Sequence, residues 1–367
     1  MSGPSDHERV NLLQLARTEG VGAITFHRLL QRYGTAAEAL TALPDMARAA
    51  GKRNGMTMYS QSKAEDEIAR VAQLGARYVV AGDDDYPPLL AEVDGAPPVL
   101  CVSGEASLAA RQCVAIVGAR NASATGRKFT RMLADRLTQA GITVVSGLAR
   151  GIDTAAHEAS RDMQTAAVIA GGIDHIYPPE NADLQRAIAE RGLLITEMPP
   201  GTAPKAEHFP RRNRIISGMS RAVIVVEAAL RSGSLITARF AAEQGRDVFA
   251  VPGSPLDPRC EGCNKLIKDG AAILTSVDDV FEALNTQNPM RRGLFAEERV
   301  FIRRDISPEG ADRDKVVSLL SPTPVHLDDI VRESGLSADV VTAVLLELEI
   351  VGRAGRDGSG MVSLRVS

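Results

Sequence analysis

Short apolar runs alternate with longer amphipathic stretches through the middle of the chain. Seven runs of five to seven residues are almost wholly apolar, and they lie at 114–118, 142–147, 166–172, 193–197, 222–228, 247–253 and 271–275. Helix-sized segments such as 123–140 and 234–245 separate them. Strands that are apolar at nearly every position are typical of a sheet covered by helices on both faces. The middle of the chain, 81–285, is therefore predicted to be an α/β domain with a doubly wound, mostly parallel sheet.

The N-terminal region, 1–80, has apolar residues at helical spacing, interrupted by Gly20 and Gly22. This pattern predicts a small helical domain. Two short helices around a Gly-Val-Gly turn resemble a helix-hairpin-helix, whose turn amides contact DNA phosphates. A small helical bundle needs the same turn for packing alone, and loop glycines are common, so packing is the favoured interpretation.

The C-terminal region consists of a predicted linker, 286–310, and a small domain, 311–367. The linker is polar, with charges of both signs and no sustained period. Three predicted helices and a hairpin then resemble a winged helix. Its expected recognition helix, 337–349, contains no Lys or Arg. Because phosphate neutralisation supplies much of the affinity for DNA, a protein contact or a structural role is favoured for this helix.

Composition limits the possible partners. A chain of 367 residues exceeds what one compact core usually holds, so two or three domains are expected. The net charge is only -4, so a nucleic-acid site would have to be a local basic patch. The N-terminus lacks a signal pattern, and no apolar run approaches the roughly 20 residues of a membrane span. The four cysteines are irregularly spaced and form no disulfide pattern, which indicates a reducing compartment. Together these features predict a cytoplasmic protein without a membrane partner.

Two loops with groups suited to binding anions follow the first two apolar runs. The first contains Gly118 and Arg120, with Ser123 at the start of a helix. Glycine allows close backbone approach, and arginine offers a planar fork for phosphate oxygens. The second contains residues whose amides and guanidinium favour an anion: Ser146, Gly147, Arg150 and Gly151.

Two further loops carry the same kinds of group. Three arginines surround an amide just before a predicted helix: Arg211, Arg212, Asn213 and Arg214. Small and hydroxyl residues open another helix: Ser232, Gly233, Ser234 and Thr237. Because the carboxyl ends of parallel strands meet at one edge of a sheet, all four loops are expected there together. They predict a ligand that carries phosphate.

Other site chemistries are less well supported. The first loop is not GxGxxG, and no acidic residue follows the second strand, so no nicotinamide or flavin cofactor is expected. The Cys260-x-x-Cys263 pair lacks further ligands, so a plain loop is favoured over a metal site. Asp153, Glu197 and Glu227 lie near strand ends, where they could act as acids or bases or could cap loops. No Ser-His-Asp or P-loop pattern occurs, and we expect no enzyme activity.

Several motifs follow one another in order within 86–280. They are GAR, SGLARGIDTAAHEA, VIAGGIDHIYPPEN, FPRRNRIISGMS and RSGSLITARFAAEQG. Together they resemble the DNA processing protein A family, also called DprA or Smf. The resemblance implies an extended Rossmann-like domain between sterile-alpha-motif-like helices and a winged helix. It also implies a homodimer that binds single-stranded DNA and hands it to the RecA recombinase during natural transformation.

The resemblance extends to single residues. The family's phosphate-contacting Gly-Ser-Arg falls on Gly118, Ala119 and Arg120, so Ala119 removes one hydroxyl donor. The chain has no tryptophan and only 4% aromatic residues, which disfavours an aromatic stacking platform and favours backbone electrostatics. An alternative function is that of a phosphoribohydrolase-like enzyme using the same phosphate loops. In an approximate alignment, Phe240 stands where those enzymes carry a glutamate.

Overall fold

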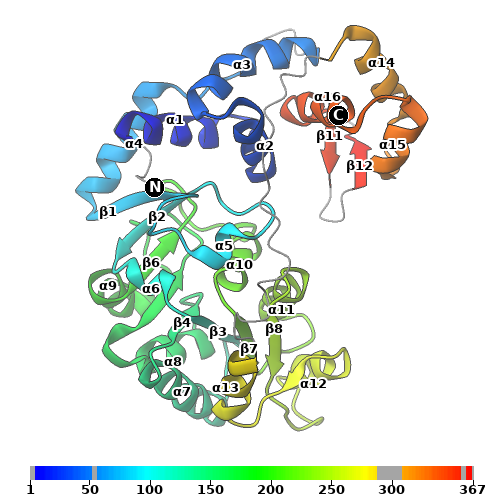
Figure 1. Cartoon of the computed structure of the whole chain (residues 1–367). Helices are drawn as coiled ribbons and strands as arrows, with labels where there is room; N and C mark the ends of the chain where they lie inside the picture. The colour runs from blue at the N-terminus through cyan, green and yellow to red at the C-terminus, as the bar shows by residue number, and fades with distance from the viewer. Residues whose placement is uncertain (1–4, 52–55, 287–307, 357–360, 366–367) are drawn as a thin grey trace. The chain divides into compact units, whose positions relative to one another are not determined.

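The computed structural model describes residues 5–51, 56–286, 308–356 and 361–365 (Figure 1). Its contacts divide the chain into two compact units. One unit contains Asp66–Glu297, and the other combines Pro4–Glu65 with Glu298–Ser367. The expected linker, 286–310, lies mostly outside the described residues. No helix in the described ranges is long and apolar enough to cross a bilayer.

A nine-stranded sheet forms the centre of the first unit, in the order β1-β2-β6-β5-β4-β3-β7-β8-β9. All seven predicted strands occur, and each of them pairs in parallel with its neighbours among the seven. The prediction of a doubly wound, mostly parallel sheet is confirmed. The strands are β1 (Ala76–Val80), β2 (Val99–Gly104), β3 (Cys113–Gly118), β4 (Thr143–Ser146), β5 (Thr165–Val168), β6 (Leu193–Thr196), β7 (Ala222–Val226), β8 (Asp247–Ala250) and β9 (Ala272–Ile273).

Strands β1 and β2 extend the sheet beyond what the apolar pattern predicts. They pair antiparallel with each other, and β2 pairs antiparallel with β6. The sheet therefore begins at Ala76 rather than at residue 81. Strand β1 is an edge strand whose first three residues are only partly buried or exposed, so it lacks a continuous apolar run. Strand β2 is fully apolar at its start but lies in a Pro-rich stretch that resembles a connecting segment.

The two faces of the sheet are covered by different helices, because alternate residues of a strand point to opposite faces. Val114 and Ile116 of β3 pack with residues of α7, α8 and α13, whereas Ala115 and Val117 pack with residues of α5, α10 and α11. The helices of this unit are α5 (Pro88–Ala91), α6 (Ser107–Ala110), α7 (Ala124–Gln139), α8 (Ile152–Ala159), α9 (Ala182–Arg191), α10 (His208–Gly218), α11 (Gly233–Glu243), α12 (Glu261–Lys268) and α13 (Val277–Thr286).

The second unit joins the N-terminal helices to a winged helix. Its elements are α1 (Asp6–Arg17), α2 (Ala23–Tyr33), α3 (Ala36–Ala49), α14 (Gly310–Leu319), α15 (Leu327–Ser334), α16 (Ala338–Ile350), β10 (Val325–His326), β11 (Ala354–Arg356) and β12 (Met361–Leu364), and α4 (Gln61–Gln73) crosses the boundary between the units. Helix α16, the expected recognition helix, buries eight residues. Near its C-terminus, Glu349 forms an ion pair with Arg28, in which Oε2 lies 2.9 Å from Nη1. These contacts support a structural role for this helix.

The order of the strands reverses beside β3. From β3 the chain continues through β4, β5 and β6 on one side, and then crosses over to place β7, β8 and β9 on the other side. In open α/β sheets, ligands bind outside the carboxyl ends of the strands at such a switch point. The carboxyl ends of β3 and β7 are therefore the expected centre of the site.

Replacement of Gly118 by alanine should destabilise the first unit. Gly118 pairs with Val226 across β3 and β7, and a Cβ atom at Gly118 would lie 2.0 Å from the Val226 carbonyl oxygen. Backbone would have to move, so we expect the free energy of unfolding to fall by about 2 kcal/mol or more. Urea unfolding followed by circular dichroism measures this change. Gly233→Ala is the control, because nothing lies within 4 Å of its Cβ position; equal losses would contradict the expected clash.

Candidate nucleic-acid interface

The loops after β3 and β4 pack directly against each other. The Ile152 amide donates to the Ala119 carbonyl at 3.2 Å. Gly151 has φ 80°, and a Cβ atom there would lie 2.2 Å from the same carbonyl oxygen, so glycine is required for this contact. The two predicted anion loops therefore form one surface, from which the side chains of Arg120 and Arg150 extend into solvent.

The arginine cluster at 211–214 lies inside helix α10, which begins at His208. The prediction that these residues come just before a helix was wrong. Pro210 resembles a loop residue in the sequence, but it occupies the first turn of α10. A proline is tolerated there because the first-turn amides have no partner within the helix. Residues 211–214 consequently point in different directions around the helix.

Arg212 points into the protein and is 6% exposed. Its Nη1 donates to the Val168 carbonyl at the end of β5, and its Nε donates to the Asn213 side chain at 3.1 Å. Burial lowers the pKa of Arg212 to about 10, against the attraction of Asp153. A Cβ atom on Gly147 would lie 2.3 Å from Arg212 Nη1. Arg212 therefore packs against Gly147 in the interior of the protein, where it supports the loop after β4 rather than contacting a ligand.

The predicted anion nest after β4 is filled by the protein's own carboxylate. Asp153 Oδ2 accepts the Gly147 amide at 3.1 Å and the Ala149 amide at 3.3 Å. Burial raises the pKa of Asp153, against the attraction of Arg212. The Ser146 hydroxyl is also buried and donates to the Ile116 carbonyl at 2.6 Å. Of this loop, Arg150 is the residue that the structure leaves exposed.

Glu197, at the end of β6, holds the other two arginines of α10. It accepts Arg211 Nε at 2.7 Å and Arg214 Nη2 at 2.5 Å, and its own side chain is 7% exposed. Arg214 also donates to the Gly95 carbonyl at 2.9 Å. The Arg211 side chain remains 61% exposed. Arg211 is thus fixed in place by Glu197 and is still accessible to a ligand.

The loop before α11 lies beside α10. The Asn213 side chain donates to the Gly233 carbonyl at 3.2 Å. Ser232 caps α11, and its hydroxyl lies 2.6 Å from the Ser234 hydroxyl. Thr237 and Ser234 are buried, whereas Gly233 is exposed. The structure therefore brings the predicted RRNR and SGS segments together, with Gly233 at the surface.

An aromatic pair adjoins the basic loops. The Arg120 guanidinium carbon lies 5.4 Å from the centre of the Phe209 ring, and the Tyr177 ring lies 5.4 Å from Phe209 at 57°. The low aromatic content of the chain had argued against such a platform. The signal was available in the motifs, because Tyr177 and Phe209 stand in the IYPPEN and FPRRNR segments. Only the fold brings these segments together.

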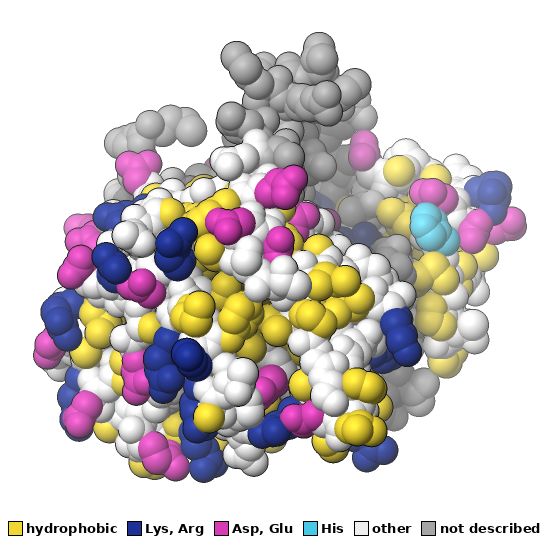
Figure 2. Space-filling model, turned by 90° about the horizontal axis from the view of Figure 1, so that it is seen from below, with side chains coloured by type: hydrophobic (Ala, Val, Ile, Leu, Met, Phe, Trp, Pro, Cys, Tyr) yellow, Lys and Arg dark blue, Asp and Glu magenta, His cyan; other side chains and the backbone are white. Residues whose placement is uncertain are grey.

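The exposed groups of this surface are few and local. Arg120, Arg150 and Arg211 are exposed, and Arg120 lies over Phe209, which packs with Tyr177. Arg150 lies 3.4 Å from Glu180, and exposed ion pairs of this kind contribute little free energy. Elsewhere charges are mixed: on the face shown in Figure 2, Lys and Arg side chains alternate with Asp and Glu. The small net charge is thus compatible with a basic site that is confined to one edge.

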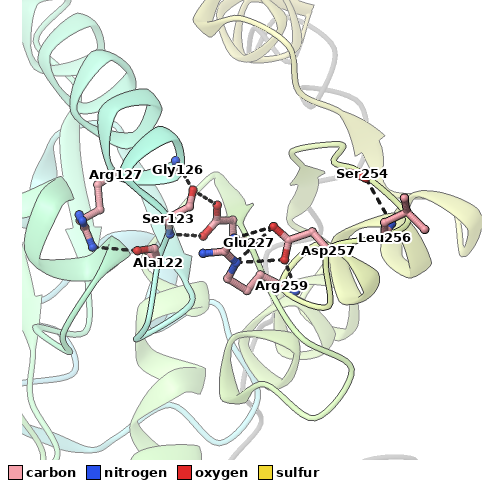
Figure 3. Close-up of polar contacts among 9 residues, drawn as sticks. All are labelled: Ala122, Ser123, Gly126, Arg127, Glu227, Ser254, Leu256, Asp257 and Arg259. Carbon is pink, nitrogen blue, oxygen red and sulfur yellow. Dashed lines mark hydrogen bonds and ion pairs between the residues drawn. The ribbon is translucent and has the colours of Figure 1, made fainter.

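The three carboxylates considered as acids or bases all have structural partners. Asp153 accepts loop amides, Glu197 binds two arginines, and Glu227 accepts the amide of Ser123 at 2.8 Å (Figure 3). Each carboxylate therefore has a role in holding the loops.

The cysteine pair spans the start of α12 and is not the plain loop that the sequence predicts. Cys260 precedes the first residue of α12, and Cys263 lies inside the helix. Burial raises the pKa of Cys263 to about 12. A thiol with such a pKa is a poor nucleophile near neutral pH.

Comparison with known proteins places the chain in a family. The family model described as DNA recombination-mediator protein A matches residues 77–285. The chain belongs to this family. A DprA-like N-terminal helix-hairpin-helix model matches 6–69, and a DprA winged-helix model matches 303–360. The Smf protein of Escherichia coli is 36% identical over 84% of this chain and 82% of its own length.

Two solved structures of family members are similar to this chain. The DNA processing protein A of Streptococcus pneumoniae has a TM-score of 0.63 and 37% identity, covering 77% of this chain and 98% of that one. The Helicobacter pylori protein was described for its single-stranded DNA binding mode. It has a TM-score of 0.53 and 28% identity, covering 57% of this chain and 96% of that one.

His157, on the helix that follows the β4 loop, should make stability depend on pH. Its buried Nδ1 lies 2.7 Å from the Thr165 hydroxyl, and burial lowers its pKa to about 3. The unfolded chain therefore binds a proton that the folded chain does not, so this stability is present above pH about 6.5 and is lost as the pH falls. We expect a loss of about 1.4 kcal/mol per pH unit below that value.

Urea unfolding of the wild type and of His157→Gln between pH 7 and pH 4.5 measures this contribution. The difference in unfolding free energy between the two proteins should shrink as the pH falls, because glutamine does not titrate. A difference that is constant with pH would contradict the buried neutral imidazole.

Proposed function

We propose that this protein binds single-stranded DNA without catalysing a reaction on it, and that it hands the strand to the RecA recombinase during natural transformation. The observation that carries this proposal is the Arg120 guanidinium above the Phe209 ring at the switch-point edge of the sheet. This arrangement offers a phosphate contact and a base-stacking face side by side. The function places the protein in the cytoplasm, with the recombinase.

The chemistry of the edge suits an unpaired strand. Arg120, Arg150 and Arg211 can each contact a phosphate, while bases stack on Phe209 and Tyr177. Every base has a π-face, so such binding tolerates any sequence. The Helicobacter pylori relative was described for binding single-stranded DNA, which agrees with this choice of ligand. The buried Arg212 and Asp153 would then act by holding the exposed groups in place.

The alternative, a phosphoribohydrolase-like enzyme, is less well supported. Hydrolysis requires a carboxylate that can reach a substrate and exchange a proton. Asp153 and Glu197 are nearly buried and bound by amides or arginines, and Glu227 is bound by Ser123. Among the exposed groups at this edge, Glu180 pairs with Arg150, and the others described above are cationic or aromatic. They bind and orient, and they do not supply acid–base chemistry.

Removal of either exposed partner should weaken DNA binding for all sequences alike. Arg120→Ala removes a phosphate contact, so the slope of log affinity against log salt should decrease by about 0.7. Phe209→Ala removes stacking, worth about 1–3 kcal/mol per base, and should leave that slope unchanged. Fluorescence anisotropy of labelled oligonucleotides of two unrelated sequences, at several salt concentrations, measures both quantities.

Arg136→Ala is the matched control for this experiment. Arg136 is exposed in the last turn of α7, at the opposite end of that helix from the loop that carries Arg120. Its loss should leave DNA affinity almost unchanged. Equal effects of Arg120→Ala and Arg136→Ala would show that general charge, and not this edge, carries the binding. Release of ribose 5-phosphate from a nucleoside monophosphate would favour the enzyme.

We further propose that the homodimer forms at the β9 edge of the sheet. Strand β9 has two residues and pairs only with β8 among the described strands. Its Ile273 is 52% exposed, beside a groove of about 1000 Å³ that apolar residues such as Leu266 line together with charged residues such as Lys265 and Asp269. An apolar sheet edge is prone to pair with another chain, and a second copy offers the same edge for a two-fold contact.

Ile273→Arg should convert the dimer to a monomer, because it places a charge at the centre of the apolar edge. Size-exclusion chromatography with light scattering gives the mass directly. Met132→Arg is the control, since Met132 is 56% exposed on α7. An Ile273→Arg protein that stays dimeric, or a wild type that is monomeric at high concentration, would rule out this interface.

A further inference from the structure

A side chain of the protein itself lies at the switch point between β3 and β7. Glu227 directly follows β7, and its carboxylate reaches the start of α7 beyond β3 (Figure 3). Oε2 accepts the Ser123 amide at 2.8 Å, and Oε1 accepts the Ser123 hydroxyl. The Ser123 oxygen in turn accepts the Gly126 amide at 2.9 Å. The carboxylate thus accepts the Ser123 amide directly. It also holds the Ser123 hydroxyl, whose oxygen accepts the Gly126 amide.

The backbone around Glu227 is shaped to hold this contact. Glu227 has φ 55°, in the left-handed region that residues other than glycine seldom adopt. A Cβ atom on Gly126 would lie 2.6 Å from Glu227 Oε1. The first turn of α7 therefore has room for a carboxylate only because residue 126 is glycine.

Two arginines near Glu227 are directed at other groups. Arg127, in the first turn of α7, points away from Glu227 and donates to the Ala122 carbonyl at 2.7 Å (Figure 3). Arg259, in the loop after β8, is bound by Asp257 through two contacts, Nε to Oδ1 at 3.0 Å and Nη2 to Oδ2 at 2.7 Å (Figure 3). Asp257 therefore offsets the charge of Arg259, which leaves the carboxylate of Glu227 as the group that faces the start of α7. An incoming phosphate would be repelled at this point of the edge.

We propose that Glu227 is a specificity-determining residue that excludes free phosphates from the switch point. In Rossmann-like sheets the phosphate of a nucleotide binds at the N-terminus of the helix after the first strand. Here the negatively charged Glu227 carboxylate lies at that position, and its charge repels a second anion. Mononucleotides and inorganic phosphate are therefore rejected, and the phosphates of a DNA strand bind at Arg120, Arg150 and Arg211 instead. The last step rests on the proposed function, whereas the exclusion does not.

The test is a calorimetric titration of the full chain with inorganic phosphate and with adenosine 5′-monophosphate. Glu227→Gln keeps the shape of the side chain and removes its charge, so it should bind both probes at least about tenfold more tightly than the wild type. Ser123→Ala keeps the charge of Glu227 and should show no gain. Glu243→Gln, the matched control, removes an exposed carboxylate of α11 that pairs with Arg239, and it should also show no gain.

Circular dichroism checks that each variant is folded. If Glu227→Gln does not fold, Asp257→Asn removes the other carboxylate near this point without touching α7, and it should tighten phosphate binding in the same direction. The proposal is overturned if the wild type binds either probe as tightly as the folded charge-removing variant. It is also overturned if Glu243→Gln gains as much affinity.

Single-stranded DNA binding, measured by anisotropy on the same samples, separates this inference from the proposed function. With one more phosphate contact available, the salt slope of Glu227→Gln should increase by about 0.7. Tighter phosphate binding without any DNA binding would refute the proposed function and leave the exclusion intact. Normal DNA binding with no gain for phosphate would refute the role of Glu227 alone.

Discussion

The buried guanidinium of Arg212 is the constraint on which the arrangement of the site depends. A buried guanidinium is removed from bulk water, so its N–H donors must find acceptors within the protein. Arg212 finds them at the end of β5 and on Asn213, and Asp153, in the first turn of α8, attracts it. This one side chain thereby connects two strand ends to α10.

Neighbouring residues of α10 take opposite roles because the helix turns by about 100° per residue. Arg212 points inward and fixes the helix on the sheet. Arg211, the preceding residue, points outward and is accessible. Phe209 lies less than one turn away and faces Arg120. The motif looks uniformly basic in the sequence. In the structure, the buried Arg212 holds α10 on the sheet and thereby fixes the position of the exposed residues of the motif.

Internal carboxylates shape the rest of this edge. Asp153 accepts amides of the loop after β4, and Glu227 accepts the Ser123 amide at the start of α7. Glycines at 147, 118 and 126 leave the space that the neighbouring side chains and backbone require. An edge built in this way has few free amides and presents guanidinium groups and rings to solvent. Such groups suit a ligand that runs across the surface more than one that enters a pocket.

The sequence by itself determined the class of fold and the loops that form the site. Strands β3 to β7 are buried at nearly every residue, so each leaves a local apolar run that can be recognised without knowledge of its partners. Strand β1 depends on pairing with β2, whose paired residues lie 19 to 27 positions further along the chain, and its half-exposed residues carry no such signal. The four segments could be placed at one edge because parallel strands end together, but the sequence did not show that 211–214 lies inside α10.

Only the tertiary structure decided what each predicted residue does. The sequence could not show that Arg212 and Ser146 are buried while Arg120 and Arg211 are exposed, because burial depends on which side of a helix or strand meets the sheet. The sequence also could not show that Tyr177 packs on Phe209. Nor could it show that Glu227, after β7, contacts Ser123, which follows the neighbouring strand β3. These contacts join segments from 32 to 104 residues apart, and chain folding alone brings them within reach.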